Sequence, residues 1–405
     1  MPIHIFAEGI FNGVAAVPYA SSVLRVVPWI ILVSLLKYYF GGARNKSERT
    51  MHSKVIMITG GTSGVGASVA RSLAERGAQI VLLTHHPASD PFLVDYVEDL
   101  RSETSNELIY AEQVNLSSLH AIRLFATKWI DNAPPRRLDA IILCAATLTP
   151  PSSNGATKTI DGIEENWGIN YLANFHLLSI LSPAIRAQPP DRDVRIIMAT
   201  CSSYIGAQLD VKDTLYKKRS FSSNAAYSAS KFALMLFALS FQKHLDAYER
   251  PDKRPNGAHV MLVDPGWSRT PGMRRWLSVG SLWGLLVYLV TWPLWWLVLK
   301  SSDQGAQSFL NAVMEADMAQ GVGSKVVKEC RLVDCSRRDV EDESLQKDLW
   351  KVSEELVQAL EKEGAMKRNL EKSHNTEKKK ESNGDDKVNG KVPGSRRSRK
   401  ADASS

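Results

Sequence analysis

Six short runs dominated by aliphatic and β-branched residues recur between Lys54 and Asp264, with longer amphipathic segments between them. The runs are KVIMI (54–58), AQIVLLT (78–84), ELIYAEQV (107–114), LDAIILC (138–144), VRIIMAT (194–200) and AHVMLVD (258–264). Apolar strands that alternate with helices are typical of a parallel sheet that is covered on both faces. The repetition therefore predicts an α/β fold, a doubly wound parallel sheet of the Rossmann type.

The chain before this core, residues 1–50, is predicted to be an N-terminal anchor with a basic flank. Val23–Phe40 is mostly apolar, and Arg44, Lys46 and Arg49 follow it. A secretory signal would need a clean cleavage site and a more uniform apolar run. We therefore expect an uncleaved membrane anchor whose basic side lies in the cytosol. A helix that lies in the membrane interface is the alternative.

Residues 51–365 are predicted to form one Rossmann-fold domain. After the sixth run it closes with a helix that starts in SSDQGAQSFLNAV (301–313), a last strand in SKVVKECRLV (324–333) and a helix with one apolar face. That face carries Leu345, Leu349, Val352, Leu356 and Leu360. Residues 366–405 are rich in Lys, Ser, Asn and Gly, and we expect a disordered basic tail there.

The charge of the chain is concentrated in this tail. The formal net charge is +7, and the ten Lys/Arg and six Asp/Glu from Glu371 onward account for +4 of it. The near balance of the rest argues against a nucleic-acid partner. The four cysteines show neither a CxxC pair nor a disulfide framework, so we expect reduced thiols and no metal site.

A glycine-rich turn, TGGTSGVG (59–66), directly follows the first predicted strand. Between a strand and a helix, such a turn lets backbone N–H groups approach a diphosphate, and the helix N-terminus favours negative charge there. The residues expected to hold the diphosphate are Gly60, Thr62, Ser63, Gly64, Val65 and Gly66. The turn predicts a dinucleotide cofactor.

The second predicted strand ends in Leu83-Thr84-His85-His86, without the acidic residue that often binds the ribose 2′-hydroxyl of NAD. An acid would repel a 2′-phosphate, so its absence favours NADP (NADPH) over NAD, with His85 or His86 at that phosphate. Two exposed loop histidines without a ligand are the alternative.

Tyr227-Ser-Ala-Ser-Lys231 places a phenol and an ammonium one helical turn apart. A free phenol has a pKa near 10, and a fixed ammonium lowers it. Together with the glycine turn, the pair predicts a proton-transferring site.

From residue 54 to residue 363 the chain resembles the short-chain dehydrogenase/reductase family, most closely its membrane-associated, retinol-dehydrogenase-like branch. The matching pieces are TGGTSGVG, TIDGIEENWGINYLANFHLL (159–178), YSASK, and Pro265-Gly266 followed by Thr270. The resemblance implies that Tyr227 exchanges the proton, Lys231 lowers its pKa and holds the nicotinamide ribose, and Asn170 holds a water. It also implies cofactor contacts at Asn115, Ala145, Pro265, Gly266 and Thr270.

The family has a serine after the fifth strand that polarises the substrate carbonyl. Counting from Arg195 puts Cys201 in that place, whereas counting back from Gly206 puts Ser203 there. Ser202 or Ser203 is favoured, because a thiol is a poor hydrogen-bond donor.

Two departures from the family pattern concern the cofactor floor. The Asn-Ala-Gly after the fourth strand is Cys144-Ala145-Ala146 here, and the Asp after the third strand is Asn115. Neither change removes the proton-transfer residues.

Trp276–Leu299 contains 24 residues without a charge, inside an apolar segment spanning 267–300. As one helix it would be about 36 Å long, against about 30 Å for the bilayer core. A single crossing would separate residues 303–363 from the rest of the domain. Pro293 interrupts the run, so we expect an apolar lid that dips into one leaflet and returns; a wholly soluble buried lid is the alternative.

These features predict an NADP(H)-dependent oxidoreductase that transfers a hydride to or from a hydrophobic carbonyl or alcohol (sterol-, retinoid- or long-chain-lipid-like) at a membrane. The expected location is the endoplasmic reticulum or a lipid droplet, with the catalytic domain facing the cytosol. Membrane lipid, membrane protein partners and a homodimer are the partners considered. A catalytically retired scaffold is the rival, and a soluble substrate is a second one.

Overall fold

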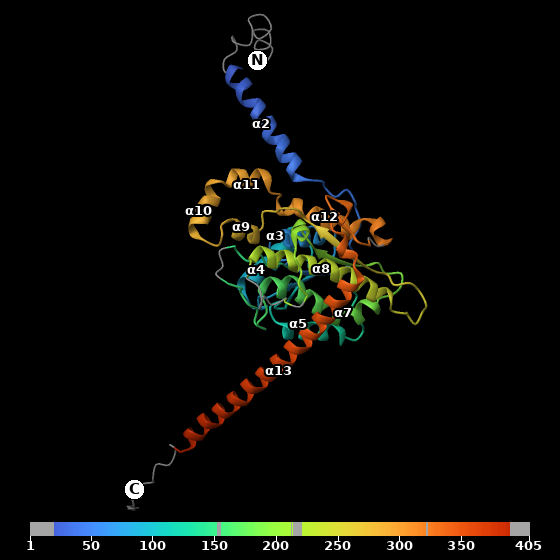
Figure 1. The fold of residues 1–405 in the computed structure, drawn as a ribbon, viewed down its shortest axis with the longest axis vertical. Helices are drawn as coiled ribbons and strands as arrows, with labels where there is room; N and C mark the ends of the chain where they lie inside the picture. The colour runs from blue at the N-terminus through green and yellow to red at the C-terminus, as the bar shows by residue number, and fades with distance from the viewer. Residues whose placement is uncertain (1–19, 152–154, 212, 214–220, 321–322, 389–405) are drawn as a thin grey trace, which may run out of the picture. The chain divides into compact units, whose positions relative to one another are not determined.

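The computed structural model describes residues 20–151, 155–211, 213, 221–320 and 323–388. Within them an eight-stranded sheet has the order β3-β2-β1-β4-β5-β6-β7-β8. Figure 1 shows the helices packed around this sheet. The strands are β1 (Val55–Thr59), β2 (Gln79–Thr84), β3 (Ile109–Gln113), β4 (Ala140–Leu143), β5 (Val194–Ala199), β6 (Ala258–Asp264), β7 (Lys325–Lys328) and β8 (Arg331–Asp334). Neighbouring strands are parallel, except that β8 is antiparallel to β7. The predicted doubly wound α/β fold is confirmed.

The strand order reverses between β1 and β4, which pair directly, with Thr59 opposite Leu143. Every residue of β1, β4 and β5 is buried, because helices cover both faces of the sheet. Ligands of doubly wound sheets bind outside the carboxyl ends of the strands at such a reversal. A ligand site is therefore expected at the segments that follow β1 and β4.

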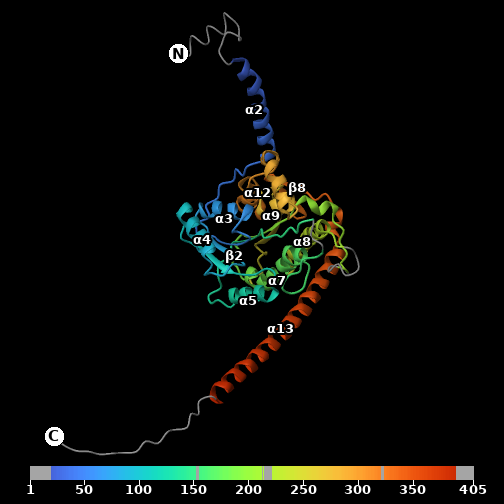
Figure 2. The ribbon, with the colours of Figure 1, turned by 90° about the vertical axis from the view of Figure 1, so that its left-hand side faces the viewer.

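Two sets of helices cover the sheet (Figure 2). On one face α3 (Gly64–Ala74), α4 (Pro91–Thr104) and α12 (Ser302–Met314) bury apolar side chains against the strands in one continuous core. On the other face lie α5 (Leu119–Ile130), α7 (Ala173–Arg186) and α8 (Ser223–Asp246). Fourteen of the 24 residues of α8 are buried, so this helix is fixed along most of its length.

The last predicted strand is a hairpin. SKVVKECRLV forms β7 and β8, and the turn between them contains Glu329 and Cys330, with φ angles of 51° and 54°. Two successive residues with positive φ are the mark of a type I′ turn, which Asn-Gly usually supplies. The sequence lacks that signal, which is why one long strand was predicted.

The chain forms two compact units, Met1–Val357 and Gln358–Ser405. In the first, α13 (Glu343–Val388) begins and buries Leu349 and Val357. In the second the same helix continues to Val388, where the sequence predicted disorder from residue 366 onward. Lys and Glu are good helix formers, and pairs such as Glu363–Lys367, one turn apart at 3.1 Å, support the helix. Residues 389–405 lie outside the described residues.

The apolar segment between β6 and α12 begins and ends at the same place on the domain. It contains α9 (Pro271–Leu277), α10 (Leu282–Val290) and α11 (Trp292–Val298), separated by short breaks. Ser268 and Lys300 form a parallel bridge at its base, and the Arg269 N–H donates to the Lys300 carbonyl at 2.8 Å. Residues 268 and 300 are thus held together, as expected for an excursion that returns.

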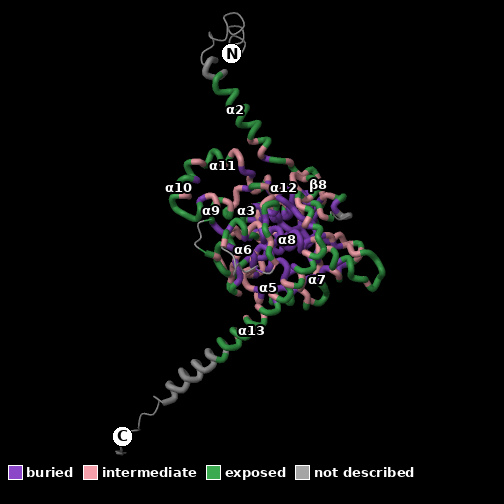
Figure 3. The backbone as a smooth tube through the Cα atoms, viewed as in Figure 1, coloured by how far each residue is buried: buried purple, intermediate pink, exposed green. Residues whose placement is uncertain are grey.

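The N-terminal helix α2 (Ala20–Gly41) and the outer side of α10 and α11 expose apolar side chains (Figure 3). Among the described residues, however, no helix combines the length and the apolarity that crossing a membrane requires. The structure therefore does not show the predicted N-terminal anchor or any other apolar span.

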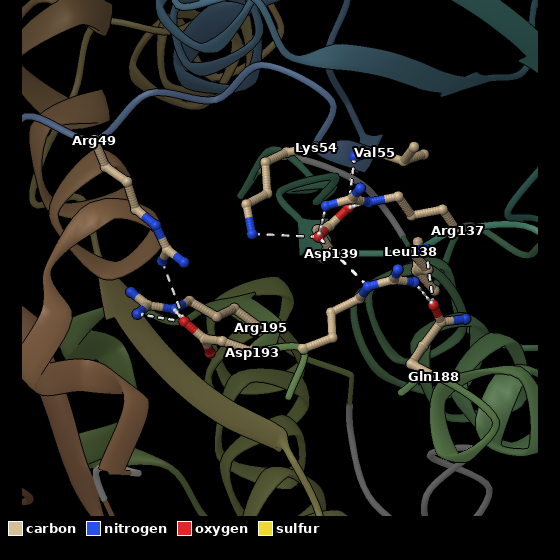
Figure 4. Close-up of polar contacts among 10 residues, drawn as sticks. Arg49, Lys54, Val55, Arg137, Leu138, Asp139, Gln188, Asp193 and Arg195 are labelled. Carbon is tan, nitrogen blue, oxygen red and sulfur yellow. Dashed lines mark hydrogen bonds and ion pairs between the residues drawn. The ribbon is translucent and has the colours of Figure 1, made fainter. Parts of the chain in front are cut away.

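The amino edge of the sheet contains two groups of ionised side chains (Figure 4). Asp139 accepts two bonds from Arg137 (2.6 and 2.9 Å), one from the Val55 N–H (2.9 Å) and one from Lys54 (3.4 Å). Burial alone would raise the pKa of Asp139, but these donors outweigh it and hold the pKa below its usual range. The group joins the starts of β1 and β4.

The second group is centred on Asp193, which binds Arg49 at 3.1 Å and Arg195 at 2.7 and 2.9 Å. Arg195 is buried, and its Nη1 also donates to the carbonyls of Ala312 and Glu315 at the end of α12. The segment between α2 and β1 is therefore fixed along the amino edge, opposite the carboxyl edge where a ligand is expected.

Candidate active site

The glycine turn lies at the reversal of the sheet, where β1 and β4 end. Gly60 has a φ of +69°, and a side chain there would lie 2.8 Å from the Cα of Ala145. A Cβ on Gly66 would lie 2.2 Å from the Gly60 carbonyl oxygen. Only glycine fits at these two positions. The turn is thus a close-packed backbone cradle at the N-terminus of α3, which fits a dinucleotide diphosphate.

The other residues of the turn contribute differently. Ser63 is the N-cap residue of α3 and is exposed, and its side chain makes no capping hydrogen bond. Thr62 is half-buried, whereas Val65 is buried facing α12, where a Cβ on Gly305 would meet its Cγ2 at 3.0 Å. Of Val65, therefore, only the backbone is placed to contact a ligand.

The segment after β6 reaches the same turn. A Cβ on Gly64 would lie 3.0 Å from the Cγ2 of Thr270, so the structure brings Thr270 next to the glycine turn. Gly266 has a φ of +72°, and its N–H donates to Asp264 at 2.8 Å. Pro265, Gly266 and Thr270 thus lie along the carboxyl edge together with the turn.

The histidines after β2 are not equivalent. The Nδ1 of His86 bonds to Asp90 at 2.7 Å, whereas His85 is exposed and stacks on His86 with 4.0 Å between ring centroids. Burial, with a smaller contribution from His86, lowers the pKa of His85, and Asp90 opposes this shift. His85 is therefore the histidine whose ring can reach a ligand, and it is neutral at pH 7.

Asn115, after β3, uses its side chain locally. Its Oδ1 accepts from the backbone N–H of Ser117 at 2.9 Å and from the Ser117 hydroxyl at 2.8 Å. The hydrogen bonds of this turn use only the Oδ1 of Asn115 and not its amide nitrogen. The structure thus places Asn115 at the carboxyl edge with its acceptor oxygen already bonded twice within the turn.

Tyr227 and Lys231 lie on one face of α8, as their spacing predicts. The Lys231 ammonium lies 5.7 Å from the centroid of the Tyr227 ring and donates to the Ala199 carbonyl at 3.0 Å. Burial raises the pKa of Tyr227, with Cys201 and Asp264 acting in the same direction, and burial lowers the pKa of Lys231. The shift of the Tyr227 pKa is therefore upward in this structure, whereas the spacing of Tyr227 and Lys231 predicted a lowered one.

The thiol of Cys201 faces the Tyr227 hydroxyl, at 3.6 Å. The Ser203 hydroxyl lies 2.8 Å from that thiol, on η3 (Ser202–Gly206). Ser202 points elsewhere: its hydroxyl donates to Asp264 at 2.9 Å and accepts from Lys328 at 3.2 Å. The structure therefore brings Cys201, with Ser203 next to it, to the phenol, and it does not bring Ser202 there.

Asp264 and Lys328 were missed by the sequence analysis. Asp264 is buried at the end of β6, bonds to the Gly266 N–H and Ser202, and lies 3.5 Å from Lys328 of β7. An acid at the carboxyl end of a predicted strand was the available signal. The pair shapes the loop after β5 that presents Cys201.

Asn170 lies in a π-helical turn, η2 (Gly168–Leu172), between α6 (Glu165–Trp167) and α7. It is fully buried, accepts from the Thr147 N–H at 2.7 Å, and donates to the Thr147 carbonyl (3.0 Å) and the Ser230 hydroxyl (3.2 Å). Ser230 in turn donates to the Tyr227 carbonyl at 2.7 Å. Asn170 thus joins the chain after β4 to α8, at the kind of π-turn that is frequent at functional sites.

The segment after β4 packs against the end of β1 and the glycine turn. The Ala145 N–H donates to the Thr59 hydroxyl at 3.2 Å, next to Gly60. Burial raises the pKa of the Cys144 thiol to about 11, although Lys231 opposes this. Cys144 is therefore a neutral thiol.

Comparisons with known proteins agree with this geometry. The sequence profile of the short chain dehydrogenase family matches residues 54–278. The "uncharacterized oxidoreductase pbr1" of Schizosaccharomyces pombe is 40% identical, over 90% of this chain and 97% of its own. Human polyprenol dehydrogenase is 28% identical over 86% and 98%, and mouse retinol dehydrogenase 13 is 29% identical over 80% and 89%.

The crystal structure of a protein from Mycobacterium paratuberculosis has the same fold, with a TM-score of 0.55 and 21% identity over 78% of this chain and 98% of that one. The resemblance to the retinol-dehydrogenase-like branch is confirmed by these relatives. The family uses NAD or NADP as its cofactor, and the cradle at Gly60 and Gly66 fits one. The chain belongs to the short-chain dehydrogenase family of oxidoreductases.

Proposed function

We propose that this chain is an NADP(H)-dependent oxidoreductase, associated with a membrane, that interconverts a hydrophobic alcohol and its aldehyde or ketone. The observation that carries the proposal is the Tyr227 hydroxyl, with Lys231 one turn along α8 and the Cys201 thiol at 3.6 Å. These groups lie at the carboxyl edge of the sheet, in the chain of a family of oxidoreductases.

Tyr227 is the proton-transferring residue of this proposal. In the direction of reduction its hydroxyl gives a proton to the carbonyl oxygen, and in the direction of oxidation its oxygen receives the proton of the substrate alcohol. The Lys231 ammonium would favour the phenolate, the form that receives the proton in oxidation and that remains after the proton is given in reduction. Asn170 and Ser230 position α8 through the Thr147 and Tyr227 backbone groups.

Cys201 takes the place of the carbonyl-polarising serine. Its thiol, a weak hydrogen-bond donor, faces Tyr227. The Ser203 hydroxyl lies 2.8 Å from the sulfur and forms a hydrogen bond with it. Ser202 keeps a positioning role through Asp264 and Lys328.

The nicotinamide cofactor, when bound, supplies or takes up the hydride. The backbone of Gly60, Thr62, Ser63, Gly64, Val65 and Gly66 would hold its diphosphate. Asn115 and Ala145 would contact the cofactor, Asn115 at its adenosine half. Lys231 would hold the nicotinamide ribose. Pro265, Gly266 and Thr270 would flank the nicotinamide amide. His85, whose neighbour His86 takes the bond to Asp90, would donate a hydrogen bond to the 2′-phosphate of NADP.

A hydrophobic substrate is supported by the lid. Trp276 Nε1 donates to Asn224 at 3.1 Å, one turn before Tyr227 on α8, so the lid contacts the catalytic helix. The outer side of α10 is apolar and exposed, with Leu282 at 85% and Trp283 at 77%. The names of the relatives, retinol and polyprenol dehydrogenase, fit an alcohol or carbonyl that arrives from lipid.

We include in this proposal that α2 and the lid associate with a membrane, with the folded domain on the cytosolic side, at the endoplasmic reticulum or a lipid droplet. Support comes from the exposed apolar residues of α2 and from the free thiols. A retired scaffold is the second candidate, favoured by Cys201 and by Cys144-Ala145-Ala146 in place of the family pattern. The presence of both Tyr227 and Lys231 favours an active enzyme over the scaffold.

The test is a comparison of lipids. The full-length protein in vesicles made with a lipid extract from cells that lack it is incubated with NADPH or NADP, next to the Tyr227→Phe variant. We expect one lipid to change in mass by two hydrogens with the wild type only. No such change with either cofactor would refute the enzyme and leave the scaffold.

A further inference from the structure

The N-terminal helix α2 packs against α11 of the lid, and Lys37 forms polar contacts between the two helices. The Lys37 ammonium donates to the carbonyls of Trp296 (2.6 Å) and Leu299 (3.2 Å) and lies 5.1 Å from the centroid of the Trp296 ring. These carbonyls belong to the last turn of α11 and the residue that follows it, where a helix leaves C=O groups without intrahelical partners. A cation is favourable at that end of a helix, so Lys37 caps α11 from a different segment of the chain.

A second contact fixes the two segments at their bases. The Ala43 N–H, just after α2, donates to Glu329 at 2.8 Å, and Lys300, where the lid returns, forms an ion pair with the same carboxylate. Farther along, the Asn45 N–H donates to Gln307 of α12 at 3.0 Å. The exit of α2 and the return of the lid are therefore bound to one side chain on the β7–β8 turn.

The outer surfaces of these segments are apolar and carry no acids. Between residues 20 and 47, and again between residues 265 and 302, the sequence has no Asp or Glu but several Lys and Arg. Arg44, Lys46, Arg274 and Arg275 are exposed next to the apolar residues. This charge pattern fits a bilayer that contains anionic lipids.

The distribution around α2 distinguishes lipid from a protein partner. Successive helical residues differ by about 100°, and nearly every residue from 26 to 36 is apolar and exposed. These are Val26, Val27, Trp29, Ile30, Ile31, Leu32, Val33, Leu35 and Leu36. A groove on a protein or a second copy of the chain would cover one stripe, whereas lipid surrounds a helix on every side.

We propose that Lys37 couples α2 to the lid, so that α2, α10 and α11 enter the bilayer as one surface and α2 holds the lid in lipid next to the active site. This rests on the membrane association in the proposed function and adds its mechanism. Lys37 is a positioning residue: it contacts the lid, and the lid contacts α8 through Trp276 and Asn224.

The test uses hydrogen–deuterium exchange of the full-length protein on vesicles of phosphatidylcholine and phosphatidylserine. In the wild type we expect the amides of residues 277–299 to be protected relative to the protein in detergent. Lys37→Met keeps the apolar stem but removes the charged donor, and should speed exchange of this segment by at least about tenfold, since hydrogen bonds from a charged group contribute that much or more. Vesicle binding through α2 should persist.

Two variants make the result specific. Lys37→Arg keeps a charged donor and should restore most of the protection. Lys46→Met removes the same charge from an exposed residue near α2 and should leave exchange of the lid unchanged.

The coupling through Lys37 and the membrane association can fail independently in this experiment. Equal lid exchange in wild type and Lys37→Met, with both bound to vesicles, would overturn the coupling and leave the membrane association standing. Equal effects of Lys37→Met and Lys46→Met would also overturn it, because charge alone would then explain the change. A wild type that neither binds vesicles nor gains lid protection would contradict the membrane association itself.

Discussion

The Sγ of Cys201 lies 3.6 Å from the hydroxyl oxygen of Tyr227. We propose above that Cys201 takes the place of the serine whose hydroxyl polarises the substrate carbonyl in the family. A thiol is a weaker hydrogen-bond donor, but here the Ser203 hydroxyl contacts the sulfur at 2.8 Å. In this proposal the thiol is the donor to the substrate oxygen, and substitution of Cys201 measures its contribution to the rate.

Cys201→Ala should lower kcat by about 10- to 100-fold, because one donor to the developing charge on the substrate oxygen is lost. Cys201→Ser should retain at least the wild-type kcat. Ser202→Ala is the matched control: its hydroxyl bonds to Asp264 and Lys328 rather than to the phenol, so kcat should change little. Steady-state kinetics on one carbonyl substrate measures all three. A larger loss in Ser202→Ala than in Cys201→Ala would contradict this assignment.

The affinity for NADPH should depend on the protonation of His85. Burial lowers the pKa of His85, so its ring becomes charged only as the pH falls below the ordinary histidine value of about 6.5. An imidazolium binds a phosphate more tightly than a neutral ring does. The ratio of the NADPH dissociation constants of His85→Asn and wild type should therefore grow by roughly threefold to tenfold between about pH 8 and pH 6.

Protonation of the 2′-phosphate cancels in that ratio, because both proteins bind the same ligand. The ratio for NADH should stay constant, and His86→Asn, whose ring is held by Asp90, should behave like the wild type. A fluorescence titration measures each constant. Tighter wild-type binding of NADH than of NADPH would refute the NADP assignment.

Asp139→Asn should lower the free energy of unfolding by about 3 kcal/mol, because Arg137 and Lys54 lose a buried carboxylate. The pKa of Asp139 is held below its usual range, so its stabilising contribution is complete above about pH 4 and is lost as the pH falls through the folded-state pKa. The difference in the free energy of unfolding between Asp139→Asn and the wild type should therefore shrink as the pH falls below about 4.

Urea unfolding at several pH values measures this difference. Asp252→Asn is the control, because Asp252 pairs with Arg250 on the surface, where water screens the charges. A variant difference that stays constant down to the lowest pH would show that the carboxylate charge of Asp139 is not what stabilises the fold.

The lid should return to the side of the membrane it left, because Ser268 and Lys300 are paired at its base. An acceptor sequon engineered into residues 318–324, and another after residue 380, should remain unglycosylated in microsomes. The same sequon on a lumenal reporter shows that the machinery is active. Glycosylation at residues 318–324 would mean that Trp276–Leu299 crosses the bilayer.

The six central strands and the order of the site motifs could be predicted because they depend on local patterns. Buried β-branched runs, a glycine turn and a pair at i and i+4 are all legible along the chain. The β7–β8 hairpin was missed because Glu329 and Cys330 adopt positive φ without being Gly or Asn. Backbone strain of that kind is set by packing, which a single sequence does not display.

The choice among Cys201, Ser202 and Ser203 depended on geometry outside the sequence. The turn of η3, which starts at Ser202, rotates Ser202 toward Asp264 and leaves the sulfur facing Tyr227. Counting from either side of the loop could not reveal that rotation. Lys37 was likewise hidden, because its contacts with Trp296 and Leu299 lie more than 250 positions away in sequence.

The most direct test of the central claim is the effect of Tyr227→Phe on turnover. The variant lacks only the hydroxyl, so NADPH binding should be nearly unchanged, while the rate of NADPH oxidation with a vesicle-borne long-chain aldehyde should fall about 10²- to 10⁴-fold. We expect that loss of rate, together with loss of rescue in cells that need the protein. Full rescue by Tyr227→Phe, or equal rates in variant and wild type, would contradict it.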